Sequence, residues 1–217
     1  MESITALTIA LDIGGFGTKA CSMISSPGSP IVNDSISFVH FNRNEIETPM
    51  IVTYLDGRLI EGREVEDRLR AEDNSIDEVQ CMRFLKLALQ PDEKTKVLAN
   101  RVIECAKRFG KTPADVMKDY IPLLVDKIKM IIASDITADD VERMPLHLII
   151  SVPQLWIAQT CRILTDAARP VSQKCSIVQE PFCATAQYVM DEIKKPSLSM
   201  RIKFKVSTIT PQALVYA

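Results

Sequence analysis

The chain has 217 residues, of which 47% are hydrophobic and 25% charged, a composition typical of folded globular domains and not of disordered or collagen-like chains. The 26 basic and 28 acidic residues are interspersed and give a net charge of −2, so we expect neither a nucleic-acid-binding surface nor attraction to an anionic membrane. The six cysteines form no C-x-x-C pair and have no histidine cluster near them, which argues against a zinc site.

Short β-compatible segments dominate the first part of the chain: 5–11, 19–24, 36–41, 50–55 and 57–60. The first two flank the stretch GGFG, which predicts a strand, a glycine turn and a returning strand. Residues 25–30 are rich in proline, glycine and serine, as loops are. Asp56-Gly57 is a turn signal that joins the last two segments into a hairpin.

Helical sequence follows Gly62. Three stretches predict helices, at 63–73, 76–89 and 92–109. We interpret the block from about 47 to 111 as an inserted subdomain. A long helix is expected to begin after Thr112, because a hydroxyl, a proline and an acid occupy its first positions. Pro122 lies inside this helix and is expected to kink it without breaking it.

The second half of the chain alternates strand and helix. Segments 146–152 and 174–179 are strand candidates, separated by a helical stretch from about 156 to 169 in which Trp156 is interpreted as a core anchor. Helical sequence follows Glu180-Pro181. This order predicts a parallel βαβ unit with a right-handed crossover and an α/β fold class. Residues 196–217 form a basic tail that we expect to be disordered or unrelated to the fold.

No segment has the pattern of a targeting or membrane-spanning sequence. Glu2 precedes a short apolar run that lacks the basic region and the cleavage site of a signal peptide. The run 146–152 is too short to cross a bilayer. The thiols are therefore expected to be reduced, in the cytoplasm or the nucleus.

The segment IALDIGGFGTKAC carries the most chemistry. Asp12 would end a buried strand, and the three glycines after it would present backbone N–H groups to a phosphate. Such a turn can hold a phosphate and water-bound magnesium, with Thr18 as a hydroxyl donor and Lys19 as a positive charge. The alternative is an ordinary hairpin turn with a solvated Asp12, because glycine-rich turns are common.

A second region has the order strand, Val-Pro, aromatic residue, helix, strand, Glu-Pro and small-residue helix: HLIISVPQLWIAQTCRILTDAA followed by IVQEPFCATAQYV. With the Asp-x-Gly turn, this order resembles the first lobe of the ATPase domain of the 70-kDa heat-shock proteins, over about 8–193. FLKLALQP, GKTPADVMKDY and SVPQLW most resemble a divergent heat-shock-70-like group of fungi and animals. The resemblance implies that 1–195 form lobe I of an actin-like (ribonuclease H-like) ATPase fold, a mixed sheet with flanking helices.

The resemblance also implies a site for ATP and Mg²⁺. Asp12 would hold magnesium through water, Glu180 would position the catalytic water or the metal, and Pro153 would lie at a switch between nucleotide states. Lys19 falls where actins place a phosphate-binding lysine. The phosphates would be wrapped by the turn residues Gly14, Gly15, Phe16, Gly17 and Thr18. From the residues alone, Glu180 beside a proline is more simply a helix-initiating acid.

The sequence departs from the family in three respects. Gly15 and Phe16 stand where the chaperones have two threonines. When Arg58-Leu59-Ile60 is aligned with the chaperones' R-L-I-G segment, Glu66 falls near their catalytic lysine, where a carboxylate would repel the γ-phosphate. The family's second phosphate loop, D-x-G-G-G-T, and its adenosine-binding motif are not found in the sequence.

We therefore expect a degenerate ATP-binding-type protein that does not hydrolyse ATP by itself. Two alternatives stay open: a non-enzymatic module that binds a protein partner through the exposed cleft face, or a fragment of a longer chaperone-like ATPase. In each case Asp12, the turn and Glu180 should converge at one end of the sheet, because Asp12 and Glu180 follow strands of the same sheet. The surface around them should be exposed and apolar.

Overall fold

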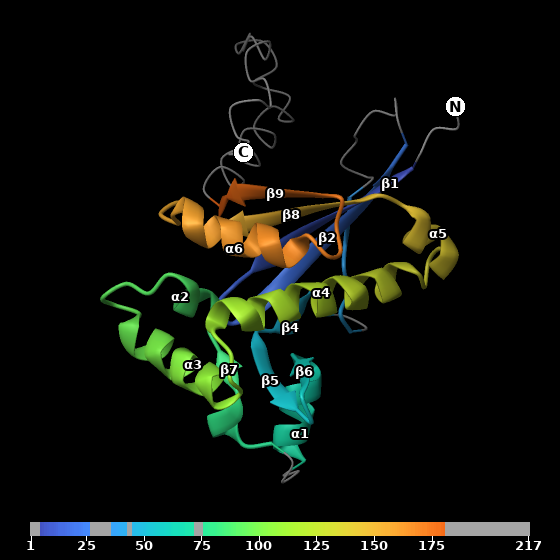
Figure 1. Ribbon diagram of the computed structural model, residues 1–217. Coiled ribbons are helices and arrows are strands. Elements are labelled where there is room, and N and C mark those ends of the chain that lie inside the picture. Colours follow the sequence, from blue (N-terminus) through green and yellow to red (C-terminus); the bar gives the residue numbers. More distant parts are fainter. Residues whose placement is uncertain (1–4, 27–35, 43–44, 72–75, 181–217) are drawn as a thin grey trace, which may run out of the picture.

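A mixed six-stranded sheet forms the larger part of the fold (Figure 1). The computed structural model describes residues 5–26, 36–42, 45–71 and 76–180. The strands of this sheet are β1 (Ala6–Ile13), β2 (Gly17–Ser25), β3 (Ile36–Phe38), β4 (Glu47–Pro49), β8 (Leu146–Val152) and β9 (Lys174–Gln179). Their order is β3-β2-β1-β8-β9, and β4 pairs with β2. Because β1, β8 and β9 are parallel while β2 is antiparallel to β1, the predicted α/β class and parallel unit are confirmed.

Helix α6 (Ala158–Ala168) connects the parallel strands β8 and β9, and it packs with helix α4 (Pro113–Ile132) against one face of the main sheet (Figure 1). Every second residue of β1 is buried in this interface, which is the strand period of two: Leu7, Ile9, Leu11 and Ile13. The facing residues of α4 recur at helical spacing and are also buried: Val116, Met117, Tyr120, Ile121, Leu124, Val125 and Ile128. A short helix, α5 (Ala138–Arg143), joins α4 to β8.

The start of α4 follows the sequence prediction. Thr112 Oγ1 accepts a hydrogen bond from the backbone N–H of Asp115 at 3.2 Å, and Asp115 Oδ2 accepts one from the N–H of Thr112 at 3.0 Å. This reciprocal capping box satisfies two N–H groups that a helix start leaves without partners, and Pro113 occupies the first helical position. The helix runs unbroken through Pro122.

A smaller sheet and three helices lie within the block predicted as an insertion. The sheet has the order β6-β5-β7 and is built from β5 (Ile51–Leu55), β6 (Arg58–Glu61) and β7 (Met82–Arg83). The helices are α1 (Arg63–Arg70), α2 (Leu85–Leu89) and α3 (Lys96–Arg108), and the short 3-10 helix η2 (Glu78–Gln80) precedes β7. β4, at the beginning of the predicted block, pairs with the main sheet instead.

The helix predicted over 76–89 is wrong. The segment forms η2, β7 and α2, because Met82 pairs with Val52 of β5 and Phe84 has a left-handed backbone conformation, with a φ of 59°. A bulky residue seldom adopts this conformation, since its Cβ is crowded there. The sequence periodicity of 76–89 contains no sign of such a reversal, and α2 is left as a helix of only five residues.

Thr18 and Tyr120 form a buried polar contact between β2 and α4. Both residues are fully buried, and their hydroxyls share a hydrogen bond of 3.0 Å. Burial also raises the pKa of the Tyr120 phenol, so this hydroxyl remains protonated over the physiological range. The Thr18 hydroxyl has one further contact, with Met50 Sδ at 3.9 Å, and thioether sulfur is a weak acceptor.

Replacing Tyr120 with phenylalanine is expected to lower the free energy of unfolding by about 1–2 kcal/mol, because the Thr18 hydroxyl would lose its main partner without regaining water. Urea unfolding followed by circular dichroism measures this change. The double variant Thr18→Val/Tyr120→Phe should lose less than the sum of the two single variants. Strict additivity would mean that the two hydroxyls do not stabilise each other.

Two predicted features, the helix after Pro181 and the basic tail 196–217, lie outside the described residues. Over the part of the chain that the structure describes, no helix has both the length and the apolar character needed to span a membrane.

Candidate functional site

The carboxyl ends of the parallel strands bring Asp12 and Glu180 to the same edge of the main sheet. Asp12 of β1 is in register with Ser151 of β8, and Ser151 is in register with Val178 of β9. Glu180 follows the last residue of β9 directly. In α/β sheets, ligands characteristically bind outside the carboxyl ends of the strands. The two carboxylates singled out from the sequence thus lie at the same edge of the sheet, on strands separated by β8.

Asp12 is the exposed residue of β1 in this region. Ser151 donates a hydrogen bond from its hydroxyl to Asp12 Oδ1 at 3.0 Å, which orients the carboxylate. The cross-strand partner of Asp12 is Lys19, so the two side chains lie on the same face of the sheet. The Lys19 ammonium is 3.6 Å from Glu47 Oε2, and both side chains are substantially exposed. Asp12 therefore faces water with a cation on the neighbouring strand.

The turn between β1 and β2 is a tight hairpin. The N–H of Gly14 donates to the carbonyl of Gly17 at 2.8 Å, and Gly15 and Phe16 form the tip. A Cβ on Gly14 would lie 2.6 Å from the Gly17 carbonyl oxygen, and one on Gly17 would lie 1.9 Å from Glu47 Oε1. Gly14 is thus needed for the close backbone approach in the turn, whereas at Gly17 the Glu47 side chain could move aside. Thr18, predicted as a hydroxyl donor to phosphate, instead points its hydroxyl into the core.

An aromatic pair joins this turn to the inserted subdomain. The rings of Phe16 and Phe84 meet edge to face, with centroids 5.0 Å apart and an interplanar angle of 83°. Gly15 also lies against Phe84, since a Cβ at Gly15 would be 3.4 Å from Phe84 Cδ1. Phe16 nevertheless remains 83% exposed. The left-handed conformation of Phe84 therefore occurs where the insertion meets the glycine turn.

Lys86 of α2 is a candidate site residue that sequence reasoning missed. It is only 8% exposed, and its ammonium donates a hydrogen bond to Glu180 Oε1 at 2.6 Å. The same nitrogen lies 5.6 Å from the centroid of the Trp156 ring, within the range of a cation–π interaction. A buried cation needs such partners to offset its lost hydration. The signal available in the sequence was a single lysine within the apolar stretch LKLAL.

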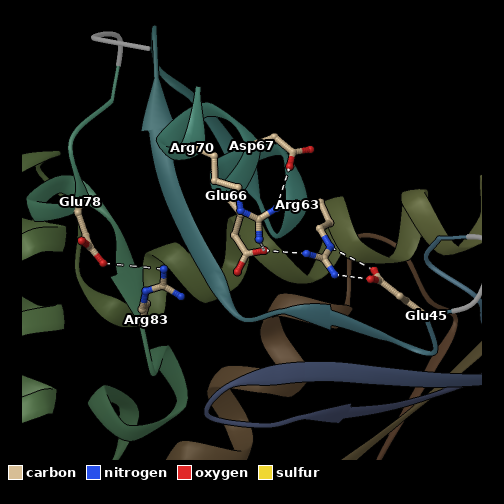
Figure 2. Close-up of polar contacts among 7 residues, drawn as sticks. All are labelled: Glu45, Arg63, Glu66, Asp67, Arg70, Glu78 and Arg83. Carbon is tan, nitrogen blue, oxygen red and sulfur yellow. Dashed lines mark hydrogen bonds and ion pairs between the residues drawn. The ribbon is translucent and has the colours of Figure 1, made fainter. Parts of the chain in front are cut away.

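Glu66, which the sequence alignment put in the place of a phosphate-binding lysine, does not belong to this site. Glu66 Oε2 accepts hydrogen bonds from Arg63 at 3.0 Å and from Arg70 at 3.4 Å, all on α1 (Figure 2). Helix α1 packs on the smaller sheet, away from β9 (Figure 1). Glu66 is therefore held by arginines of its own helix, and the cation beside Glu180 is Lys86.

The loop from Pro153 to Ile157 forms a third side of the site. Trp156 packs partly against the main core, as predicted, while its neighbours Leu155 and Ile157 are 85% and 54% exposed. Gln90, the residue that ends α2, forms hydrogen bonds with this loop. Phe16 of the turn and Leu155 and Ile157 of this loop are apolar and exposed, and we call these three side chains the apolar rim.

The chemistry of these groups suits a phosphate ester with a hydrated divalent cation. Mg²⁺ commonly binds proteins through one or two carboxylates and completes its shell with waters and phosphate oxygens, and Asp12 with Ser151 offers such a partial ligand set. The ammonium groups of Lys86 and Lys19 can attract phosphate oxygens. Among the described residues, no three or more His, Cys, Asp and Glu side chains are grouped as ligands for a metal ion.

Two grooves occur elsewhere, on the inserted subdomain. One is lined mainly by charged residues of α1 and the η2 region, including the Glu78–Arg83 ion pair, whose N···O distance is 3.9 Å (Figure 2). The other lies between η2 and α3 and includes Phe84, Cys81 and Cys105. Neither groove includes Asp12 or Glu180 in its lining. In the charged groove the ionic groups are already paired with one another.

The comparisons with known proteins assign no family to this chain. No protein-family model matches the chain, and no curated protein matches it significantly.

Proposed function

We propose that residues 1–195 form the first lobe of an actin-like, heat-shock-70-like nucleotide-binding domain, and that the carboxyl ends of β1 and β9 bind the phosphates of a magnesium nucleotide. The observation that carries this proposal is the meeting of Asp12, the 14–17 turn and the Lys86–Glu180 pair at one edge of the sheet. The strand order, with an antiparallel hairpin beside three parallel strands, supports it.

Each group has a role in this proposal. Asp12, oriented by Ser151, holds Mg²⁺ through a water molecule, and the backbone of the turn contacts the phosphates. Lys86 donates to a terminal phosphate oxygen, and its hydrogen bond to Glu180 positions the lysine in the absence of ligand. The chain thus contains a lysine for the phosphate, in place of the carboxylate that the alignment put there. When bound, ATP would supply the phosphoryl group, and Mg²⁺ would neutralise its charge.

These residues form an open half-site, which sets the expected affinity. The side chain of Glu180 is 42% exposed and Asp12 is exposed, so water and salt weaken the attraction of both groups for a ligand. The free energy gained from a few charge-assisted hydrogen bonds is partly offset by the free energy cost of association. The expected dissociation constant for Mg-ATP is therefore on the order of 1 mM. Hydrolysis by these 217 residues alone is not expected, since an exposed γ-phosphate lacks charge stabilisation in the transition state.

Titration of the chain with Mg-ATP, followed by two-dimensional NMR of the backbone amides, tests the proposal together with a phosphate-release assay. We expect amide shifts confined to the turn, Lys86, Ser151 and Glu180, with no phosphate release. Asp12→Asn should weaken the response to Mg-ATP more than the response to ATP in a chelating buffer. Absence of shifts at these amides, or shifts spread equally over α1 and α3, would remove the basis for a nucleotide site.

The alternative function is a non-enzymatic interaction module, and the apolar rim favours it. Phe16 and Leu155 of this rim are 83% and 85% exposed. Large apolar side chains that are exposed together usually mark a binding surface. A protein partner would then cover the rim and contact Lys86 or Asp12 only at its border. In that case Phe16→Ser and Leu155→Ser abolish partner binding, and Mg-ATP neither competes with nor enhances it.

A further inference from the structure

We propose that Gln90 is a positioning residue, which fixes the 153–157 loop to the helix that carries Lys86 so that lysine and loop move as one unit. This inference deepens the proposed function and rests on it for its role in phosphate binding. The structural coupling itself is independent of any ligand.

Both ends of the Gln90 amide form hydrogen bonds with the loop or with α6. Its Nε2 donates to the carbonyl of Leu155 at 2.9 Å, and its Oε1 accepts from the N–H of Ile157 at 2.9 Å and from the Thr160 hydroxyl at 3.0 Å. A carbonyl can only accept and a backbone N–H can only donate, so these partners determine which end of the amide is oxygen. The three contacts therefore hold one defined orientation of Gln90.

Gln90 replaces a local cap of α6. The N-cap residue of this helix is Ile157, which has no side chain able to accept a hydrogen bond. In a capping box, the N–H of the N-cap residue is instead accepted by a glutamate or glutamine side chain at N3 of the same segment. Here an acceptor is supplied from α2, 67 residues earlier in the chain. The beginning of α6 consequently depends on the position of α2.

Lys86 lies on α2, and Gln90 is the C-cap residue that ends this short helix. Lys86 places its ammonium over the Trp156 ring, while Gln90 holds the backbone of the two residues that flank Trp156. Two residues of the α2 segment therefore contact the same loop. The other end of α2 is fixed to the glycine turn through Phe84 and Phe16. Helix α2 therefore links the turn, Lys86 and the loop.

The chain contains a single tryptophan, so fluorescence of Trp156 reports on this loop alone. We expect Gln90→Ala to shift Trp156 emission to the red and to increase its quenching by acrylamide, with an unchanged far-UV circular dichroism spectrum. Amide hydrogen exchange at Ile157 should accelerate by about tenfold or more, because its acceptor is lost. Gln90→Glu still offers a side-chain oxygen as acceptor for Ile157 and Thr160. Hydrogen exchange at Ile157 should therefore return toward the native rate in this variant.

A matched control is Thr137→Ala, which removes the cap of α5, where Thr137 Oγ1 accepts from the Asp140 N–H at 3.2 Å. It should lower stability without altering Trp156 fluorescence.

Coupling to Lys86 is tested by the double variant: after Gln90→Ala, Lys86→Met should change Trp156 quenching less than it does in the native chain. Additive effects, or unchanged exchange at Ile157, would overturn the positioning role. If the coupling is present but Mg-ATP leaves Trp156 emission unchanged in the native chain, the proposed nucleotide site is at fault instead.

Discussion

Replacing Lys86 with methionine is expected to weaken binding of Mg-ATP to the chain by about tenfold to a hundredfold. The ammonium is the buried cation of the site, and a charge-assisted hydrogen bond contributes about 1.5–3 kcal/mol, which corresponds to this range of affinity. Methionine has a similar length and packs well in irregular apolar surroundings, so the Leu85–Leu89 helix should be retained. The change is measured by the NMR titration described above, at constant ionic strength.

Lys111→Met is a closely matched control for this variant. The Lys111 ammonium lies 2.8 Å from Asp119 Oδ2 and 5.4 Å from the centroid of the Tyr54 ring, which reproduces the carboxylate and aromatic contacts of Lys86 at a place away from the glycine turn. Both substitutions therefore remove one ion pair and one cation–π contact, and only one of them removes the proposed phosphate ligand. An equal loss of affinity in both variants, or none in Lys86→Met, would exclude the assigned role of Lys86.

Removal of the lysine charge should not unfold the chain. Glu180 is left without its ion-pair partner, but its side chain is 42% exposed and can be hydrated instead of remaining as an unpaired buried charge. The stabilities of Lys86→Met and Lys111→Met are thus expected to be similar. This expectation separates a loss of binding from a loss of folded protein.

The sequence alone predicts that Asp12 and Glu180 lie at one edge of the sheet, but it does not predict that Lys86 reaches the same edge. Alternation of apolar residues identifies β1 and β8, and the parallel βαβ order fixes which ends of the strands share an edge. Lys86 reaches the same edge from a segment whose backbone reverses at Phe84, and neither periodicity nor residue spacing records such a reversal. The alignment through Arg58-Leu59-Ile60 placed Glu66 at the site because spacing in an insertion does not determine tertiary contacts.

The orientation of Thr18 could have been predicted. Asp12 and Lys19 are cross-strand partners on the exposed face, and successive residues of a strand point to opposite faces. Thr18 must therefore face the core if Lys19 faces water. The pairing with Tyr120 could not be foreseen in the same way, because it joins residues 102 positions apart through the packing of α4 on the sheet.

Gly62→Ala is expected to have the largest effect on stability, a loss of about 3 kcal/mol or more in the free energy of unfolding. Gly62 has φ 58° and ψ −125°, a conformation that is strained for any residue with a Cβ. A Cβ there would also lie 2.5 Å from Thr48 Oγ1, which is buried. For a chain of this size, the predicted loss lowers the melting temperature by roughly 6–12 °C, as measured by thermal unfolding.

Gly57→Ala separates the two causes of that loss. Gly57 also has a positive φ, of 80°, but a Cβ there meets nothing within 4 Å, so only the backbone strain of about 1 kcal/mol applies. The double variant Gly62→Ala/Thr48→Ala removes the clashing hydroxyl and should recover part of the stability lost in Gly62→Ala. Thr48 belongs to β4 of the main sheet, whereas Gly62 follows β6 of the smaller one. This recovery would therefore show that the two sheets approach too closely at Gly62 for a side chain there. Equal losses for Gly62→Ala and Gly57→Ala, with no recovery in the double variant, would show instead that the backbone conformation alone requires glycine at this junction.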